Sequence, residues 1–299
     1  MKKKIALDII VFSLIVLFIY FAVFKNNINI KTDNLIAVVY LEGIIGEVGK
    51  NSFNSNDVKK IFNELEQAKP KGIVLRISSP GGTVYETDKI YNLIKQFKIK
   101  NNIKVYVSMG EVCASGGYYI AMASDSIFAE PLTETGSIGV IMSLVNYEEL
   151  LNKVGINIIT IKSGKYKDIG SPYRKLTPEE KTMFEEIIFE MYEKFIGVVK
   201  ENRINLSEST IRNLAQGQIY LGSKAYKLGL VDKIGLVDKI GTLDDAISEL
   251  KKDLNLKTIN IKEYKIQKSF LEGILSTTSN IIQQIKNPSQ IIFEYKLSE

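Results

Sequence analysis

The sequence Gly-Ile-Val-Leu-Arg-Ile-Ser-Ser-Pro-Gly-Gly at residues 72–82 decides the fold, because a buried strand and the turn that ends it lie next to each other. Residues 72–78 are mostly apolar and are bounded by glycine and proline, as is typical of a strand buried on both faces. A helix is predicted to follow the Pro-Gly-Gly turn and to run to about Phe97. The alternation of apolar runs with helical patterns continues along the chain and predicts an α/β fold with largely parallel strands.

Further elements extend this pattern on both sides of residues 72–82. Apolar runs predict strands at residues 35–41, 105–108, 127–129, 138–142, 156–161 and 258–262. Helical spacing predicts helices at residues 58–65 (with a cap within 55–57), 118–124, 148–154, 177–202 and 243–254, and one ending at Gly229. The helix from Thr177 has the clearest start, because a capping threonine is followed by proline and then by glutamate.

The composition excludes several classes of protein. The net charge of +5 is modest and the charged residues are interspersed, so nucleic-acid binding is not expected. The single cysteine, Cys113, rules out an intramolecular disulfide. A globular mixture of 45% hydrophobic and 24% charged residues suits one large α/β domain or two small ones.

Histidine is absent from all 299 residues, and its absence limits the chemistry of the chain. A serine or cysteine hydrolase usually has an imidazole as its general base, and a hydrolytic zinc site usually includes one as a ligand. Acyl-transfer chemistry would instead need a lysine whose surroundings disfavour its charge. We therefore expect no metal and no cofactor, and we look for a serine paired with a lysine.

The N-terminus has the pattern of a membrane anchor. Three lysines at positions 2–4 precede an apolar run at residues 5–24, in which Asp8 is the only charge. A helix of about 20 residues can cross the hydrocarbon core, and the exit at residues 20–25 (Tyr-Phe-Ala-Val-Phe-Lys) is a poor cleavage site. The positive-inside rule places the N-terminus in the cytoplasm. We predict a tip and anchor at residues 1–27, a linker at 28–34, a main domain at 35–262 and a C-terminal arm at 263–299.

The sequence Cys-Ala-Ser-Gly-Gly-Tyr-Tyr at residues 113–119 lies where a strand gives way to a helix. Its two glycines allow a tight turn with no side chain to block a substrate, and the helix start directs N–H groups at Ser115. This arrangement suits a nucleophile whose intermediate carries an oxyanion, although a glycine-rich helix cap without chemistry fits the spacing equally well. Cys113 has no imidazole to activate it and is expected to be a small buried packing residue.

Two other segments can contribute to such a site. The turn Ser-Pro-Gly-Gly at residues 79–82 offers the N–H of Gly81 or Gly82 as a second oxyanion donor, unless it is only a turn. Residues 163–168 (Ser-Gly-Lys-Tyr-Lys-Asp) offer two lysines, Lys165 and Lys167, and the spacing does not choose between them. A lysine base must be neutral, so its pKa has to fall from about 10.4 by two units or more, which requires burial.

Together these segments resemble the signal peptide peptidase A family of bacterial membrane-anchored serine peptidases, in its short single-core form. The resemblance covers roughly residues 35–247. Its parts occur in family order, namely the turns at 79–82 and 114–119, Thr-Gly-Ser-Ile-Gly at 135–139, the segment 163–168, and Gly-Leu-Val-Asp at 229–232. The resemblance implies a crotonase-like or Clp-protease-like α/β core of repeated strand–strand–helix units, assembled as a homo-oligomeric ring or dome.

The resemblance also implies a role for each site residue. Ser115 matches the nucleophile, and Lys167 matches the general base. Ser137 matches the serine that orients this lysine, Gly82 matches an oxyanion donor, and Gly116 is the natural second donor. In related short enzymes the dyad is completed across neighbouring subunits, so whether the serine and lysine of one chain meet stays open.

The implied function is hydrolysis of peptide bonds at the bacterial cytoplasmic membrane. The substrates would be remnant signal peptides and other unfolded peptides, and the peptidase domain would lie outside the cytoplasm behind a single-pass anchor. A crotonase-type acyl hydrolase is an alternative, but obvious carboxylates placed as acid and base are lacking. A non-catalytic peptide-binding scaffold is another, although the presence of all the catalytic matches favours the enzyme.

Two departures from the family pattern stand out. Gln218 occupies a position where arginine is expected, and Leu-Val-Asp-Lys-Ile-Gly occurs twice in succession at residues 230–235 and 236–241. The duplication leaves the strand register near it open. The role of the C-terminal arm is also open, and one hypothesis is that the arm reaches an active site as a self-substrate or inhibitor.

Overall fold

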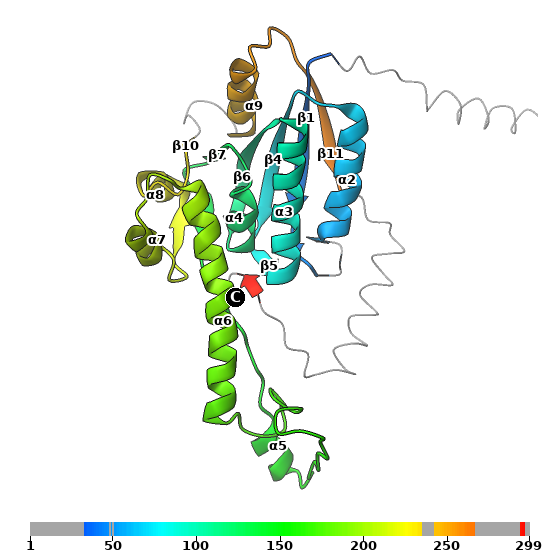
Figure 1. The fold of residues 1–299 in the computed structure, drawn as a ribbon, viewed down its shortest axis with the longest axis vertical. Coiled ribbons are helices and arrows are strands. Elements are labelled where there is room, and N and C mark those ends of the chain that lie inside the picture. The colour runs from blue at the N-terminus through cyan, green and yellow to red at the C-terminus, as the bar shows by residue number, and fades with distance from the viewer. Residues whose placement is uncertain (1–32, 48, 50, 235–241, 267–293, 297–299) are drawn as a thin grey trace, which may run out of the picture. The chain divides into compact units, whose positions relative to one another are not determined.

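A parallel sheet forms the centre of the fold and carries the turn at Ser115. The computed structural model describes residues 33–47, 49, 51–234, 242–266 and 294–296. Along the sheet the strand order is β10, β7, β6, β4, β1, β11, and each neighbouring pair is parallel (Figure 1). The strands are β1 (Leu35–Glu42), β4 (Gly72–Ser79), β6 (Lys104–Ala114), β7 (Ser126–Ala129), β10 (Lys233–Ile234) and β11 (Asn260–Lys265). The predicted α/β fold is confirmed.

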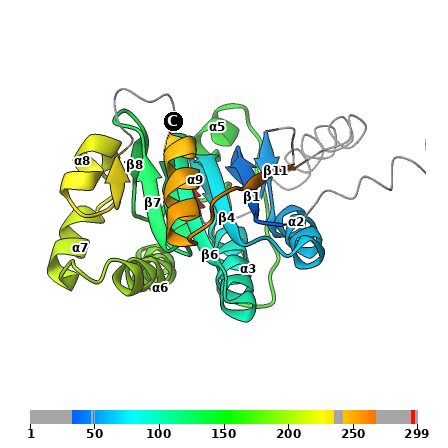
Figure 2. The same ribbon diagram turned by 90° about the horizontal axis from the view of Figure 1, so that it is seen from above.

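Helices cover both faces of this sheet. Their bounds are Ser55–Ala68 for α2, Val84–Asn101 for α3, Gly116–Ala121 for α4, Pro178–Asn202 for α6 and Thr242–Asp253 for α9. Ala37 and Val39 of β1 pack in a core with α2, α3, α4 and α6, whereas Ile36 and Val38 pack in a second core with α9. Figure 2 shows α2, α3 and α6 side by side along one side of the sheet. Because β1 is buried on both faces, it needs the continuous apolar run that predicted it.

Short strands beside the main sheet produce a strand–strand–helix repeat. β4 is followed by β5 (Gly81–Thr83) and α3, and β1 is followed by β2 (Ile44–Ile45), β3 (Ser52–Phe53) and α2. The short strands form a second sheet of order β12, β5, β2, β3, in which β12 (Glu294–Lys296) runs antiparallel to β5. The register of β6 against β4 shifts near the end of β6, and its last residues pair with a further strand of the same sheet, β8 (Glu134–Gly136). This repeat agrees with the Clp-protease-like core that was expected.

Helix caps explain where two of the helices begin. Thr177 caps α6 and forms a reciprocal capping box with Glu180, as the sequence predicted. At α2 the cap is Asn54, which forms the same kind of box with Asp57, so the predicted cap within residues 55–57 is wrong. Asparagine serves here because its short side-chain oxygen accepts from two N–H groups of the first turn.

Residues 141–176, called here the projecting segment, differ most from the predictions. The expected helix is present as α5 (Glu148–Lys153), but residues 138–142 and 156–161 form no strand. Ile161 is 96% exposed, so this apolar run lies at the surface instead of in the sheet. Figure 1 shows α5 and the loops around it at the end of α6 that points away from the sheet.

Several predicted features lie at or beyond the limits of the described residues. The predicted anchor at residues 5–24 is outside them, and none of the helices within them is long and apolar enough to cross a membrane. The first copy of the duplicated segment supplies β10, which pairs with β7, while residues 236–241 of the second copy are not described. β11 continues to Lys265, three residues past the predicted end of the main domain.

Candidate active site

Ser115 lies at the sharp turn between β6 and α4. Its backbone angles, φ 51° and ψ −115°, are rare for a residue with a side chain and persist only where the surroundings enforce them. Its N–H donates to the carbonyl of Gly136 at 2.8 Å, and its carbonyl accepts from the N–H of Tyr119 at 2.9 Å. Turns of this kind, from strand to helix, present nucleophilic serines in other hydrolases.

Two glycine turns meet beside Ser115. A Cβ on Gly116 would lie 3.2 Å from the Cα of Gly81, and one on Gly117 would lie 2.8 Å from a backbone carbonyl oxygen of the first turn. A Cβ on Gly82 would lie only 2.0 Å from a backbone carbonyl oxygen of β2. Only glycine allows the backbones to approach this closely. The two turns that the sequence singled out are therefore brought together.

The N–H groups at these turns differ in whether they already donate a hydrogen bond. The Gly81 N–H donates to the hydroxyl of Ser79 at 3.1 Å. Gly116 is the first residue of α4, where an amide has no acceptor within its own helix. The Gly81 N–H is thus already engaged, and Gly82 and Gly116 stay the predicted oxyanion donors.

Strand pairing brings Ser137 next to Ser115. Ala114 of β6 pairs with Gly136 of β8, so the serines that follow these residues leave two parallel strands at the same level. Ser137 also has a positive φ of 49° and is buried. Its N–H donates to the carbonyl of Gln218 at 2.7 Å. Gln218 thus supports this turn through its backbone carbonyl. Because the contact does not use the side chain, it does not require the arginine that is expected at position 218.

Tyr118 and Tyr119, whose contacts the sequence did not reveal, fix α4 in place. The Tyr118 hydroxyl donates to a backbone carbonyl of the Gly-Leu-Val-Asp segment at 2.9 Å, and the Tyr119 hydroxyl donates to Asp88 at 2.8 Å. The Tyr119 ring packs against Tyr91 of α3 and Phe195 of α6, with centroids 5.2 and 5.0 Å apart. The sequence did offer one signal for these contacts, because Tyr118 and Tyr119 directly follow the glycine turn. A helix as short as α4 needs side-chain contacts to stabilise it.

Lys167 lies in the projecting segment and is exposed. In the described part of the chain, no hydrogen bond joins it to Ser115 or Ser137, and Figure 1 shows the projecting segment at the far end of α6. Within one chain the structure therefore brings Ser115, Ser137 and the two glycine turns together and leaves the predicted base apart.

The two lysines of the projecting segment differ in their partners. The Lys165 ammonium pairs with Glu179, which also accepts from the hydroxyl of Tyr166. The contact with Glu179 raises the pKa of Lys165, which opposes a role as base. Lys167 has no ion pair among the residues that the structure describes. Lys167 stays the predicted base that the family resemblance implies.

Cys113 is fully buried in β6, two residues before the candidate nucleophile. Burial raises the pKa of its thiol, so the reactive thiolate is not populated near neutral pH. This agrees with the expected packing role. Within the described ranges, no cluster of three or more acidic or cysteine side chains is placed to hold a metal ion.

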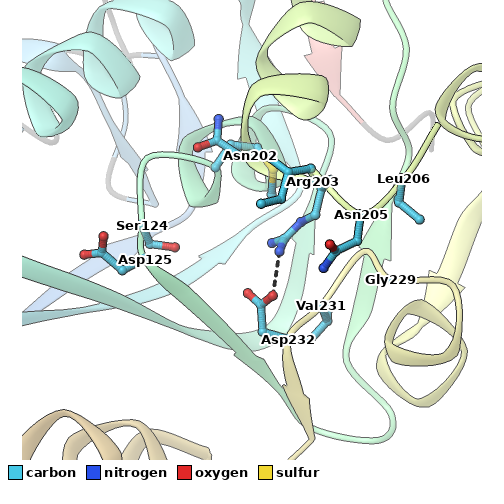
Figure 3. Close-up of a pocket in the computed structure, with 11 residues that line it drawn as sticks. Ser124, Asp125, Asn202, Arg203, Asn205, Leu206, Gly229, Val231 and Asp232 are labelled. Carbon is cyan, nitrogen blue, oxygen red and sulfur yellow. Dashed lines mark hydrogen bonds and ion pairs between the residues drawn. The ribbon is translucent and has the colours of Figure 1, made fainter. Parts of the chain in front are cut away.

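The pocket shown in Figure 3 is separate from this site. It has a volume of about 410 Å³ and is lined by the end of α6, the loop after it and the Gly-Leu-Val-Asp segment. Arg203, whose side chain is 7% exposed, points at Asp232 and donates to it at 2.8 Å. None of the candidate catalytic residues lines this pocket. The pocket lies between elements of the fold and is no part of the candidate active site.

Comparison with known proteins identifies the class of this chain. The model of peptidase family S49 matches residues 98–257, and the Clp protease model matches residues 33–135. A protein of Enterococcus faecium named as signal peptide peptidase SppA is 38% identical over 241 residues, which cover 78% of this chain and 68% of that protein. Proteins named as proteases in Synechocystis sp. and Methanocaldococcus jannaschii are 44% and 38% identical, covering 59% and 70% of this chain and 62% and 63% of their own lengths.

The fold and these relatives define a serine peptidase with a Clp-protease-like α/β core. The chain belongs to peptidase family S49, the family of the signal peptide peptidases A.

Proposed function

We propose that Ser115 and Lys167 form a dyad that hydrolyses peptide bonds. The observation that carries this proposal is the constrained turn of Ser115, with the two glycine turns packed beside it. The Ser115 hydroxyl forms a bond to the peptide carbonyl carbon while its proton passes to the neutral amine of Lys167. The N–H groups of Gly82 and Gly116 donate to the oxyanion, and Ser137 orients the lysine. The C–N bond then breaks, the leaving amine takes the proton, and water hydrolyses the ester.

We also propose that Lys167 serves the Ser115 of a neighbouring copy in a ring. The projecting segment exposes an unusual number of large apolar side chains, including Leu144, Val145, Leu150, Val154, Ile156, Ile158, Ile159 and Ile161. A large exposed apolar surface marks an interaction site. Docking of this surface on a second copy would bury it and would bring Lys167 out of water, where a lysine amine loses its proton more readily.

Extended peptides fit the edge of β5 as substrates. β12 pairs antiparallel with β5 and places Tyr295 opposite Gly82, which supports binding of an extended backbone beside the oxyanion donors. Unfolded peptides such as signal-peptide remnants present an unpaired backbone that can add to β5 in this way. The same pairing supports the hypothesis that the C-terminal arm occupies an active site as an inhibitor or self-substrate.

The predicted anchor would place the peptidase domain close to its proposed substrates. An N-terminal helix at residues 5–24, with its N-terminus inside, would hold the peptidase domain at the outer face of the bacterial cytoplasmic membrane. Signal peptides remain in that membrane after secretion. A ring of copies anchored there would therefore act on peptides as they leave the bilayer.

Labelling with a serine-reactive fluorophosphonate tests the dyad in the detergent-solubilised full chain. We expect mass spectrometry to locate the label on Ser115 and expect no label in Ser115→Ala or Lys167→Ala. Lys165→Ala is the matched control and should still label, because the Lys165 ammonium is paired with Glu179. Labelling of Lys167→Ala at the wild-type rate would contradict the dyad. Peptide binding without any labelling of Ser115 would favour the non-catalytic scaffold.

A further inference from the structure

We propose that Arg174 is a positioning residue for the catalytic lysine, because it fixes the loop that carries Lys167 and occupies the carboxylates of Asp168 and Glu180. The inference rests on the proposed function of Lys167 and deepens it. Arg174 lies seven residues after the lysine and belongs to the same projecting segment.

Arg174 holds the residue that directly follows Lys167. Its Nε donates to one carboxylate oxygen of Asp168 at 2.9 Å, and its Nη2 donates to the other at 3.0 Å and to the Asp168 backbone carbonyl at 3.1 Å. Lys162 also pairs with the Asp168 carboxylate, at 2.5 Å. An arginine fork that binds a carboxylate through two nitrogens fixes direction as well as distance. The backbone on the C-terminal side of Lys167 is therefore held in one orientation.

The same guanidinium ties this loop to the first turn of α6. Arg174 Nη1 donates to Glu180 at 2.8 Å and Nη2 donates to it at 2.5 Å. Glu180 is in turn the capping-box partner of Thr177, and its side chain is 4% exposed. Arg174 thus connects the Lys167 loop to the most clearly specified helix start in the chain. A bound loop can present its lysine to a neighbouring copy without a large loss of conformational entropy.

The cluster also occupies three carboxylates of the projecting segment and of the start of α6. Asp168 and Glu180 are bound by Arg174, and Glu179 is bound by Lys165. Glu149 lies 3.9 Å from Lys175. One carboxylate oxygen of Glu148 is buried and has no hydrogen-bond partner among the described residues. Within the residues that the structure describes, no carboxylate is left within ion-pair distance of the Lys167 amine. An adjacent free carboxylate would favour the protonated amine, which cannot act as a base.

Replacing Arg174 should therefore change the pH dependence of the reaction as well as its rate. In Arg174→Gln the carboxylate of Asp168 keeps Lys162 on one oxygen. The other oxygen, which accepts from Arg174 Nε, becomes available to the neighbouring lysine. We expect the pH profile of Ser115 labelling to move up by about one unit, because an opposite charge within reach shifts a titration by one unit or more. Near neutral pH this shift corresponds to a labelling rate about tenfold below wild type.

The double variant Asp168→Asn/Arg174→Gln separates the two effects of Arg174. It removes the freed carboxylate, so its pH profile should return toward that of wild type while the rate stays low, because the loop is still untethered. Asp168→Asn alone keeps the pair between Arg174 and Glu180 and should lower the rate without moving the profile upward. This single variant also keeps the test valid if Arg174→Gln fails to fold.

Arg212→Gln is the matched control. Arg212 pairs with Glu193 and Glu208, in contacts of 2.6 and 2.9 Å. Its replacement therefore removes two ion pairs of the same kind, one to the C-terminal half of α6 and one within α7 (Glu208–Leu214). It should leave the pH profile of labelling unchanged.

The outcomes distinguish this inference from the proposed function. If labelling requires Lys167 but Arg174→Gln and Arg212→Gln have the same pH profile, the role of Arg174 is wrong and the dyad stands. If Arg174→Gln moves the profile and the double variant does not restore it, the carboxylates are not what Arg174 controls, and the inference is again wrong. If Lys167→Ala labels like wild type, the dyad itself is wrong, and the role of Arg174 fails with it.

Discussion

At the scale of single residues, the candidate site depends on glycines, which have no side chain. Gly82 and Gly116 lie where a Cβ would press against neighbouring backbone, and Ser115 adopts backbone angles that a side chain disfavours. Such close backbone contact is useful where N–H groups must point at a reacting carbonyl. Glycine at these positions thus lets the two turns pack closely beside Ser115.

Gly82→Ala tests this packing directly. The added Cβ would meet a backbone carbonyl oxygen at 2.0 Å, so we expect loss of Ser115 labelling and a destabilisation of about 3 kcal/mol. Gly197→Ala in α6 is the control, because nothing lies within 4 Å of its Cβ. The control should label normally and gain about 0.5–1 kcal/mol from better helix propensity. Thermal unfolding and labelling measure both effects, and normal labelling of Gly82→Ala would contradict the proposed arrangement.

At the scale of elements, α6 connects the body of the protein to the projecting segment. Its N-terminal end carries the capping box and the contacts to Arg174, and its C-terminal end carries Arg203, which binds Asp232 (Figure 3). Asp232 belongs to the Gly-Leu-Val-Asp segment that also accepts a hydrogen bond from Tyr118. The helix is therefore fixed at its C-terminal end to the segment that also binds Tyr118, and at its N-terminal end to the loop of Lys167.

Asp232→Asn should weaken the C-terminal attachment of α6. The Arg203 side chain is 7% exposed, and a buried guanidinium left without its carboxylate is costly, so we expect a loss of about 3 kcal/mol in the free energy of unfolding. Glu201→Gln is the control, because its pair with Lys95 is exposed and should contribute less than about 1 kcal/mol. Urea unfolding of both variants measures the difference, and equal losses would contradict a structural role for the pair of Arg203 and Asp232.

The N-terminal attachment of α6 should persist in acid. The guanidinium of Arg174 lowers the pKa of Glu180 from 4.5 to about 2. Because the folded-state pKa is depressed, this carboxylate stabilises the fold above pH 4.5, and its contribution is lost as the pH falls toward 2. A carboxyl ¹³C NMR titration, assigned with Glu180→Gln, should give a midpoint near 2 in wild type and a higher one in Arg174→Gln. A wild-type midpoint near 4.5 would show that the contact is not formed.

The sequence predicted best those features that local chemistry decides. The capping box at Thr177 and the strand-to-helix turn at Ser115 follow from neighbouring residues, and both were predicted correctly. The apolar run at residues 156–161 was wrongly predicted as a strand, since periodicity does not reveal whether a sheet or another molecule covers a run. The contacts of Arg174 could not be predicted either, because they depend on how a loop folds back on a helix.

At the scale of the whole molecule, one chain places the predicted nucleophile and the predicted base far apart. Ser115 is buried at the glycine turns, whereas Lys167 is exposed on a segment covered with apolar side chains. Both observations are explained together if a second copy covers that segment and receives its lysine. The proposed enzyme is then an assembly in which each active site belongs to two chains.

Mixing two inactive variants tests this central claim most directly. Ser115→Ala lacks the nucleophile and Lys167→Ala lacks the base, so neither should cleave peptides alone. If each site joins two copies, co-assembly at equal amounts should restore about one quarter of wild-type activity, because that fraction of neighbouring pairs holds both residues. Activity near this level in the mixture is the result we predict. A mixed assembly, verified by distinct affinity tags, that stays as inactive as its components would contradict a dyad shared between chains.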